Sequence, residues 1–184
     1  MSQTKAELLD PLNGVVSSGD VKINDVSVGK GANSVAGNTV LGESALDASV
    51  SGGNNTAIGT AALTTLTSGS ENTGVGKDAL QFLTSGNNNS CVGNRAGEAI
   101  TTGGSNTVIG SAALLSNTTA SDNVAVGKSA LQANTTGHSN VAVGRGSLDA
   151  NTTADNNTAV GHNSLGANTT GTQNTAVGSN ALDA

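Results

Sequence analysis

The chain has 184 residues, of which 26 are glycine and only one, Phe82, is aromatic. Because large side chains are scarce, we do not expect the thick globular core that this length normally permits. The net charge of −6, with only seven Lys and Arg residues, argues against a nucleic-acid partner, since phosphate binding needs a concentrated basic face. A single cysteine, Cys91, excludes an internal disulfide, and no apolar run is long enough for membrane insertion.

Residues 1–20 precede the regular pattern of the chain. Thr4 and Glu7 have the spacing of a capping box, and Pro11 would end the short helix that follows it. Such a short helix is marginal alone, so we expect it to order only when docked; a frayed terminus is the alternative. The segment has no apolar stretch of the kind that secretory signals carry.

Residues 21–37 are the next segment, and they do not match the regular spacing that follows. Gly29 and Gly42 are 13 positions apart, which is shorter than the later repeat. We therefore predict a transition coil here.

From residue 38 to residue 184 the chain is repetitive. An asparagine recurs nine times at an unbroken spacing of 17 residues, and the last repeat is incomplete. Fixed spacing without insertions indicates a stack of identical coils. The nine asparagines are Asn38, Asn55, Asn72, Asn89, Asn106, Asn123, Asn140, Asn157 and Asn174.

We number each coil from its asparagine, which is position 0. Position 3 is always Val, Ile or Leu, position 4 is always Gly, position 7 is Ala or Ser, and position 8 is Leu except at Gly97. Short β-branched runs bounded by Gly and Asn predict strands and turns. We expect strands at positions 1–3 and 7–11, a turn at the glycine, and a polar turn at 12–16. The predicted class is all-β, a parallel β-roll or β-solenoid with 17-residue coils.

Positions 3 and 8 are predicted to point into the coil and form its core. These residues are Leu41, Ile58, Val75, Val92, Ile109, Val126, Val143, Val160, Val177, Leu46, Leu63, Leu80, Leu114, Leu131, Leu148, Leu165 and Leu182. The asparagines are predicted to form a structural ladder, in which each side-chain amide bonds to the coils above and below. A ligand-binding strip is the alternative for this column.

Position 2 carries only small or apolar residues, although strand alternation would turn it away from a core at position 3. We therefore expect position 2 to be an inter-chain face, and the chain to be an obligate homo-oligomer. The residues of this predicted face are Val40, Ala57, Cys91, Val108, Ala125, Ala142, Ala159 and Ala176, with Gly74 in the third coil.

The units NTAIGTAAL, NTAVGSNAL and NVAVGKSAL resemble the head repeats of trimeric autotransporter adhesins, which form a parallel β-roll shared by three chains. They equally resemble the NTAVG-type repeats of bacteriophage tail fibres, and the opening TKAELLDPLNG is similar to the start of marine phage fibre proteins. The resemblance covers residues 24–184. It implies an intertwined or closely packed homotrimer.

The missing secretion signal and anchor domain favour the phage family, because virion parts assemble in the host cytoplasm. On this hypothesis the protein is a structural tail fibre located in the virion, and its N-terminus binds other virion proteins. The attachment residues would be Leu8, Leu9, Pro11 and Leu12. Because the final repeat has no cap, we expect the natural chain to continue towards a tip that binds the host receptor.

The alternative is the head of a trimeric adhesin on a bacterial cell surface. A second alternative is an ice-binding solenoid that uses the threonine columns at positions 12 and 13, such as Thr135 and Thr136. Neighbouring residues on a strand point to opposite faces, which disfavours a flat threonine array there.

No pattern indicates an enzyme, a cofactor or a metal site. His138 and His162 occupy different positions of different coils, and Cys91 has the setting of a buried inert thiol. The four NTT units match the glycosylation acceptor pattern, but we interpret them as turns. Position 11 changes from Leu or Ile to Asn after the fourth coil, which predicts a change of outer contour near residue 104.

Overall fold

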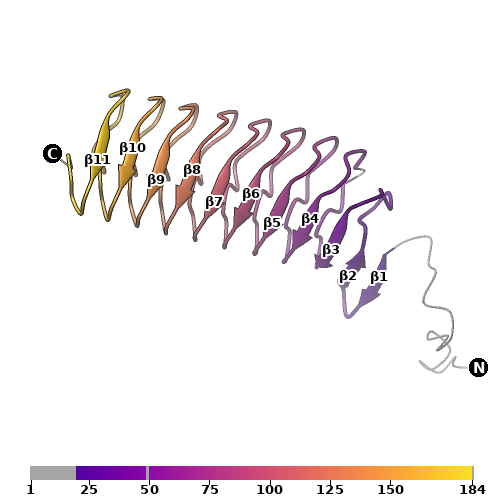
Figure 1. Ribbon diagram of the computed structural model, residues 1–184. Helices are drawn as coiled ribbons and strands as arrows, with labels where there is room; N and C mark the ends of the chain where they lie inside the picture. The colour runs from indigo at the N-terminus through magenta and orange to yellow at the C-terminus, as the bar shows by residue number, and fades with distance from the viewer. Residues whose placement is uncertain (1–19, 49, 184) are drawn as a thin grey trace, which may run out of the picture.

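The computed structural model describes residues 20–48 and 50–183, and these contain strands and turns but no helix. Eleven strands form one sheet in chain order, and the chain winds as a β-solenoid of about eight turns (Figure 1). The predicted all-β solenoid with coils of 17 residues is confirmed. The strands are β1 (Val21–Ile23), β2 (Val26–Gly29), β3 (Thr39–Gly42), β4 (Thr56–Ile58), β5 (Thr73–Val75), β6 (Ser90–Val92), β7 (Thr107–Ile109), β8 (Val124–Val126), β9 (Val141–Val143), β10 (Thr158–Val160) and β11 (Thr175–Val177).

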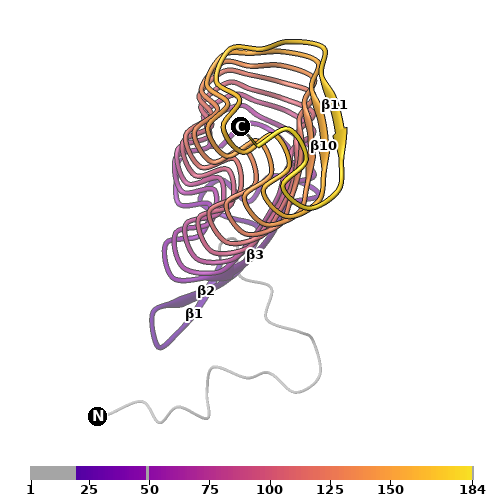
Figure 2. The same ribbon diagram turned by 90° about the vertical axis from the view of Figure 1, so that its left-hand side faces the viewer.

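Strands β3 to β11 are parallel, and each residue pairs with the residue 17 positions later. Ala142, for example, pairs with Ala159, and Val143 pairs with Val160. Figure 2 views the stack from its C-terminal end, where successive coils repeat the same outline. Stacking therefore places each side chain on its counterpart in the neighbouring coil.

Each of these coils has one strand, and the predicted second strand at positions 7–11 is wrong. Positions 6, 8 and 16 adopt positive φ, as Ser129 (57°), Leu131 (52°) and Ser139 (56°) show in one coil. A strand needs extended backbone, so this wall is a series of turns. Its backbone still bonds from coil to coil, because the Leu131 N–H donates to the Ser147 carbonyl at 3.0 Å.

Positive φ also explains which apolar residue position 8 carries. A β-branched side chain in the left-handed region is a genuine outlier, whereas leucine branches one atom further out. Gly97, the exception at this position, has φ of 60°. The glycine at position 4 has a separate cause: a Cβ on Gly127 would lie 2.5 Å from the carbonyl oxygen of Gly144 in the next coil.

The core of the coil contains positions 2, 7 and 8. Position 8 is buried as predicted from Leu46 to Leu165, whereas Leu182 in the last coil is 62% exposed. Position 2 is buried as well, which reverses the predicted strand faces. The physical reason is the narrow interior: a Cβ on Gly74 would lie 3.3 Å from Cγ of Leu63, and the residues that fit opposite the leucines of position 8 are no larger than valine.

Position 11 also points inward, and there the core changes character. Leu66, Leu83 and Ile100 are fully buried in the second to fourth coils. In later coils asparagine takes their place: Asn151 Nδ2 donates to Asn134 Oδ1 and to the Ala154 carbonyl, both at 3.0 Å. The predicted change near residue 104 is therefore in the interior and not in the outer contour.

The asparagines at position 0 form the predicted ladder. Asn123 Oδ1 accepts the backbone N–H of Asn140 at 2.9 Å, and Asn123 Nδ2 donates to the Gly137 carbonyl at 3.0 Å. Side-chain to backbone bonds of the first kind run from Asn38 to Asn174. Within the described residues no buried side-chain N or O atom lacks a hydrogen-bond partner.

The predicted transition coil at residues 21–37 contains a β-hairpin. Strands β1 and β2 pair antiparallel through a two-residue turn, in which Asn24 and Asp25 both have positive φ, as a type I′ turn requires. Strand β2 then pairs antiparallel with β3 and covers its edge. The proposed attachment residues Leu8, Leu9, Pro11 and Leu12 lie outside the described residues.

The ladder predicts the effect of replacing one amide by a carboxylate. Asn123→Asp keeps an acceptor for Asn140 but removes the donor to Gly137, and it buries a charge. We expect a loss of about 1–3 kcal/mol in the free energy of unfolding, measured by urea denaturation. Asn94→Asp, the same change at an exposed position, should stay within about 0.5 kcal/mol. Equal effects of the two substitutions would contradict the ladder's role.

Candidate interaction surface

The outer side of the parallel sheet is the most regular exposed surface of the molecule. In each of the three-residue strands β4 to β11 the middle residue is buried and the two outer residues face outward, as in β7, where Val108 is fully buried and Ile109 is 47% exposed. We call positions 1 and 3 of the nine coils the outward sheet face. Its residues are Thr39, Leu41, Thr56, Ile58, Thr73, Val75, Ser90, Val92, Thr107, Ile109, Val124, Val126, Val141, Val143, Thr158, Val160, Thr175 and Val177.

The outward sheet face has no charged residue on any of its nine rungs. Rungs about 4.8 Å apart and columns about 7 Å apart give a strip roughly 40 Å long and 10 Å wide. This strip of about 400 Å² combines the apolar column of position 3 with a column of mostly threonine at position 1, and it is as large as the largest exposed patch of a typical monomer, which is often functional. The surface is therefore suited to contact another regular surface over its whole length.

This geometry corrects the predicted inter-chain face. Position 2, which was expected to face other chains, lies inside the coil: Val40, Ala57, Cys91, Val108, Ala125, Ala142, Ala159 and Ala176 are at most 4% exposed. Position 3, which was expected to form the coil core, lies outside and is exposed or half-buried from Leu41 to Val177. The alternation along the strand was predicted correctly, but the inner and outer faces were exchanged.

Cys91, His138 and His162, the titratable residues considered as candidate site residues, are engaged in packing or in side-chain contacts. Burial raises the pKa of the Cys91 thiol, which makes the reactive thiolate scarce. The Nδ1 atom of His138 accepts the Ser121 N–H at 3.0 Å, while Nε2 of His162 lies 3.2 Å from Nη1 of Arg145. Among the described residues, no group of three or more His, Cys, Asp or Glu side chains is placed to hold a metal ion.

The NTT units and the threonines of positions 12 and 13 lie in turns. The side chains of Asn117, Asn134 and Asn151 are fully buried with their amide nitrogens donated to carbonyls, so the folded chain does not present them as glycosylation acceptors. Thr135 Oγ1 donates to the Thr152 carbonyl. The regular threonines that do share a flat face are those of position 1, which sequence reasoning missed because it assigned the strand faces in reverse.

Comparison with known proteins adds no relative. No protein-family model matches the chain, and no curated protein or solved structure matches it significantly. Over the part of the chain that the structure describes, there is no helix with the length and apolar character needed to cross a membrane.

Proposed function

We propose that this protein is a structural shaft component of a bacteriophage tail fibre, located in the virion and assembled as a homotrimer through the outward sheet face. The observation that carries the proposal is the unbroken stack of register-matched coils with one uncharged apolar strip along its side. The resemblance of the NTAVG-type units to fibre repeats supplies the phage assignment and the number of chains.

The architecture suits a spacer. Each coil contacts only its neighbours, so the length of the rod grows by about 4.8 Å for every repeat added. The buried amide ladders tie each coil to the next in one register, because a slipped coil would leave Asn side chains and backbone groups without partners. A shaft of this kind separates its two ends by a distance that the repeat number determines.

The form of the outward sheet face supports the proposed self-association. A partner with a different spacing would meet some rungs and miss others, whereas a second copy of the chain has the same spacing on every rung. Burying valine and isoleucine side chains between copies gains free energy in proportion to the apolar area removed from water. The N-terminal segment with Leu8, Leu9, Pro11 and Leu12 would dock to other virion proteins.

Charges placed on the outward sheet face should separate the copies. We expect a light-scattering mass above that of a monomer for the wild type, and a monomer for the double variant Ile109→Asp/Val143→Asp, because assembly would bury its carboxylates. The control Thr102→Asp/Thr136→Asp puts two carboxylates in exposed turns of the preceding coils and should keep the wild-type mass. A folded wild-type monomer would overturn the proposed assembly.

The proposed location in a virion is tested by a separate measurement. Mass spectrometry of purified phage particles from the source of the gene should detect peptides of this chain, and immunolabelling should place them on tail fibres. The same antibodies applied to intact bacteria test the adhesin head. Labelling confined to the bacterial surface would replace the phage proposal with the adhesin.

A second candidate function, ice binding, is favoured by one observation. Positions 1 and 3 present threonine and valine or isoleucine side by side on parallel, register-matched rungs, as Thr158 and Val160 do in β10. Such a flat, uncharged and repetitive face can order water over its whole area. Thermal hysteresis measured on the wild type, and its loss in Ile109→Asp/Val143→Asp, would support this function; freezing without hysteresis would reject it.

A further inference from the structure

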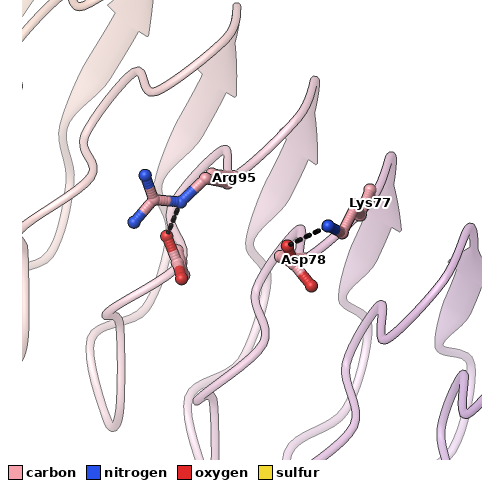
Figure 3. A network of polar contacts seen from close by, with 4 residues as sticks. Lys77, Asp78 and Arg95 are labelled. Atoms are coloured by element: carbon pink, nitrogen blue, oxygen red, sulfur yellow. Dashed lines mark hydrogen bonds and ion pairs between the residues drawn. The ribbon is translucent and has the colours of Figure 1, made fainter.

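The corner that follows each strand holds all the Lys and Arg residues of the coils. These four residues lie at positions 5 and 6, in a chain whose net charge is −6. Two of them are neutralised locally: Lys77 Nζ lies 3.7 Å from the Asp78 carboxylate, and Arg95 Nε donates to Glu98 (Figure 3). In these two coils, a carboxylate of the same chain neutralises the cation at this corner.

Lys128 and Arg145 are different. Both are exposed, and no carboxylate among the described residues lies within ion-pair distance of either. They occupy position 5 of consecutive coils, and His162 occupies the same position in the next coil. We call Lys128, Arg145 and His162 the cationic row, in which Lys128 and Arg145 carry the positive charge and His162 contacts Arg145.

The backbone holds the cationic row in place. The Gly146 N–H donates to the Lys128 carbonyl at 3.1 Å, and the Asn163 N–H donates to the Arg145 carbonyl at 2.9 Å. The row therefore runs along the rod with the spacing of the rungs. Arg145 Nη1 lies 3.2 Å from His162 Nε2; because a guanidinium only donates, the ring nitrogen is the acceptor. This contact steadies the guanidinium of Arg145.

Like charges on neighbouring rungs repel each other, and no carboxylate of the described residues lies within ion-pair distance to offset this repulsion. A phosphate or sulfate group can bridge the two cations, since arginine binds such an oxyanion through two N–H groups and lysine adds a point charge. Uncharged residues at the same position, such as Thr60 and Ser111, restrict the row to these coils. The exposed, linear arrangement fits a chain of anionic groups lying along the rod.

We propose that the cationic row is a binding site for the phosphate or sulfate groups of a polyanion. This site goes beyond a spacer role, because it places a ligand contact on the shaft itself. It does not depend on the number of chains, since all three residues of the row lie on one chain at positions that the outward sheet face does not include.

The test uses the full chain and three probes at low ionic strength: a fluorescent heparin oligosaccharide, inorganic polyphosphate and neutral dextran. The variant Lys128→Thr/Arg145→Ser introduces residue types that position 5 already carries, so folding should be retained and is checked by circular dichroism. Loss of two charge-assisted contacts should weaken binding at least about tenfold. Lys77→Thr, which removes a cation already paired with Asp78, should change affinity by less than about twofold.

Each outcome has a defined meaning. Binding of heparin, of polyphosphate or of both supports the site if the double variant shows the expected loss; heparin alone indicates the anionic groups of a sulfated sugar, and polyphosphate alone indicates phosphate. Failure of both anions to bind, equal binding of dextran, or unchanged affinity in the double variant would overturn it. The light-scattering mass of the double variant should equal that of the wild type, which separates this site from the proposed assembly.

Discussion

Coil-to-coil hydrogen bonding in a single register is the constraint on which the rest of this structure depends. The amide of Asn123 shows how it operates: its oxygen accepts from the backbone of the next coil, while its nitrogen donates to the Gly137 carbonyl. A side chain that both accepts and donates satisfies a corner that no strand pairing reaches. Because these hydrogen bonds join neighbouring coils, an insertion in one coil would break its hydrogen bonds to the coils on both sides.

The narrow interior is the second consequence of this stacking. In a coil with one short strand and several turns, the leucine at position 8 occupies most of the space opposite the strand, so position 2 is limited to alanine, glycine, cysteine or valine. The left-handed backbone at position 8 then selects leucine over β-branched residues. Further along the chain, buried asparagines replace leucine and isoleucine at position 11, and amide hydrogen bonds take over part of the stabilisation.

The exterior divides into surfaces of distinct character. The outward sheet face is uncharged on nine rungs, whereas the neighbouring corner holds paired cations in Lys77 and Arg95 and the cationic row in later coils. We propose self-association for the first surface and an anionic ligand for the second. Both surfaces arise from repetition, because one residue choice becomes a column when coils stack in register.

The 17-residue period by itself determined the coil length, the parallel stacking and the asparagine ladder, because any repeated hydrogen-bonding residue must meet its own copies in a stack. It also determined that neighbouring strand residues face opposite ways. Only the tertiary structure decided which way was inward: position 2 packs against the leucine of position 8, which leaves space for residues no larger than valine, and the leucine and isoleucine residues that position 3 carries lie on the outer side. From the sequence alone, positions 2 and 3 were equally possible as the outward column. The packing of the position 8 leucines against position 2 decided that position 3 faces outward.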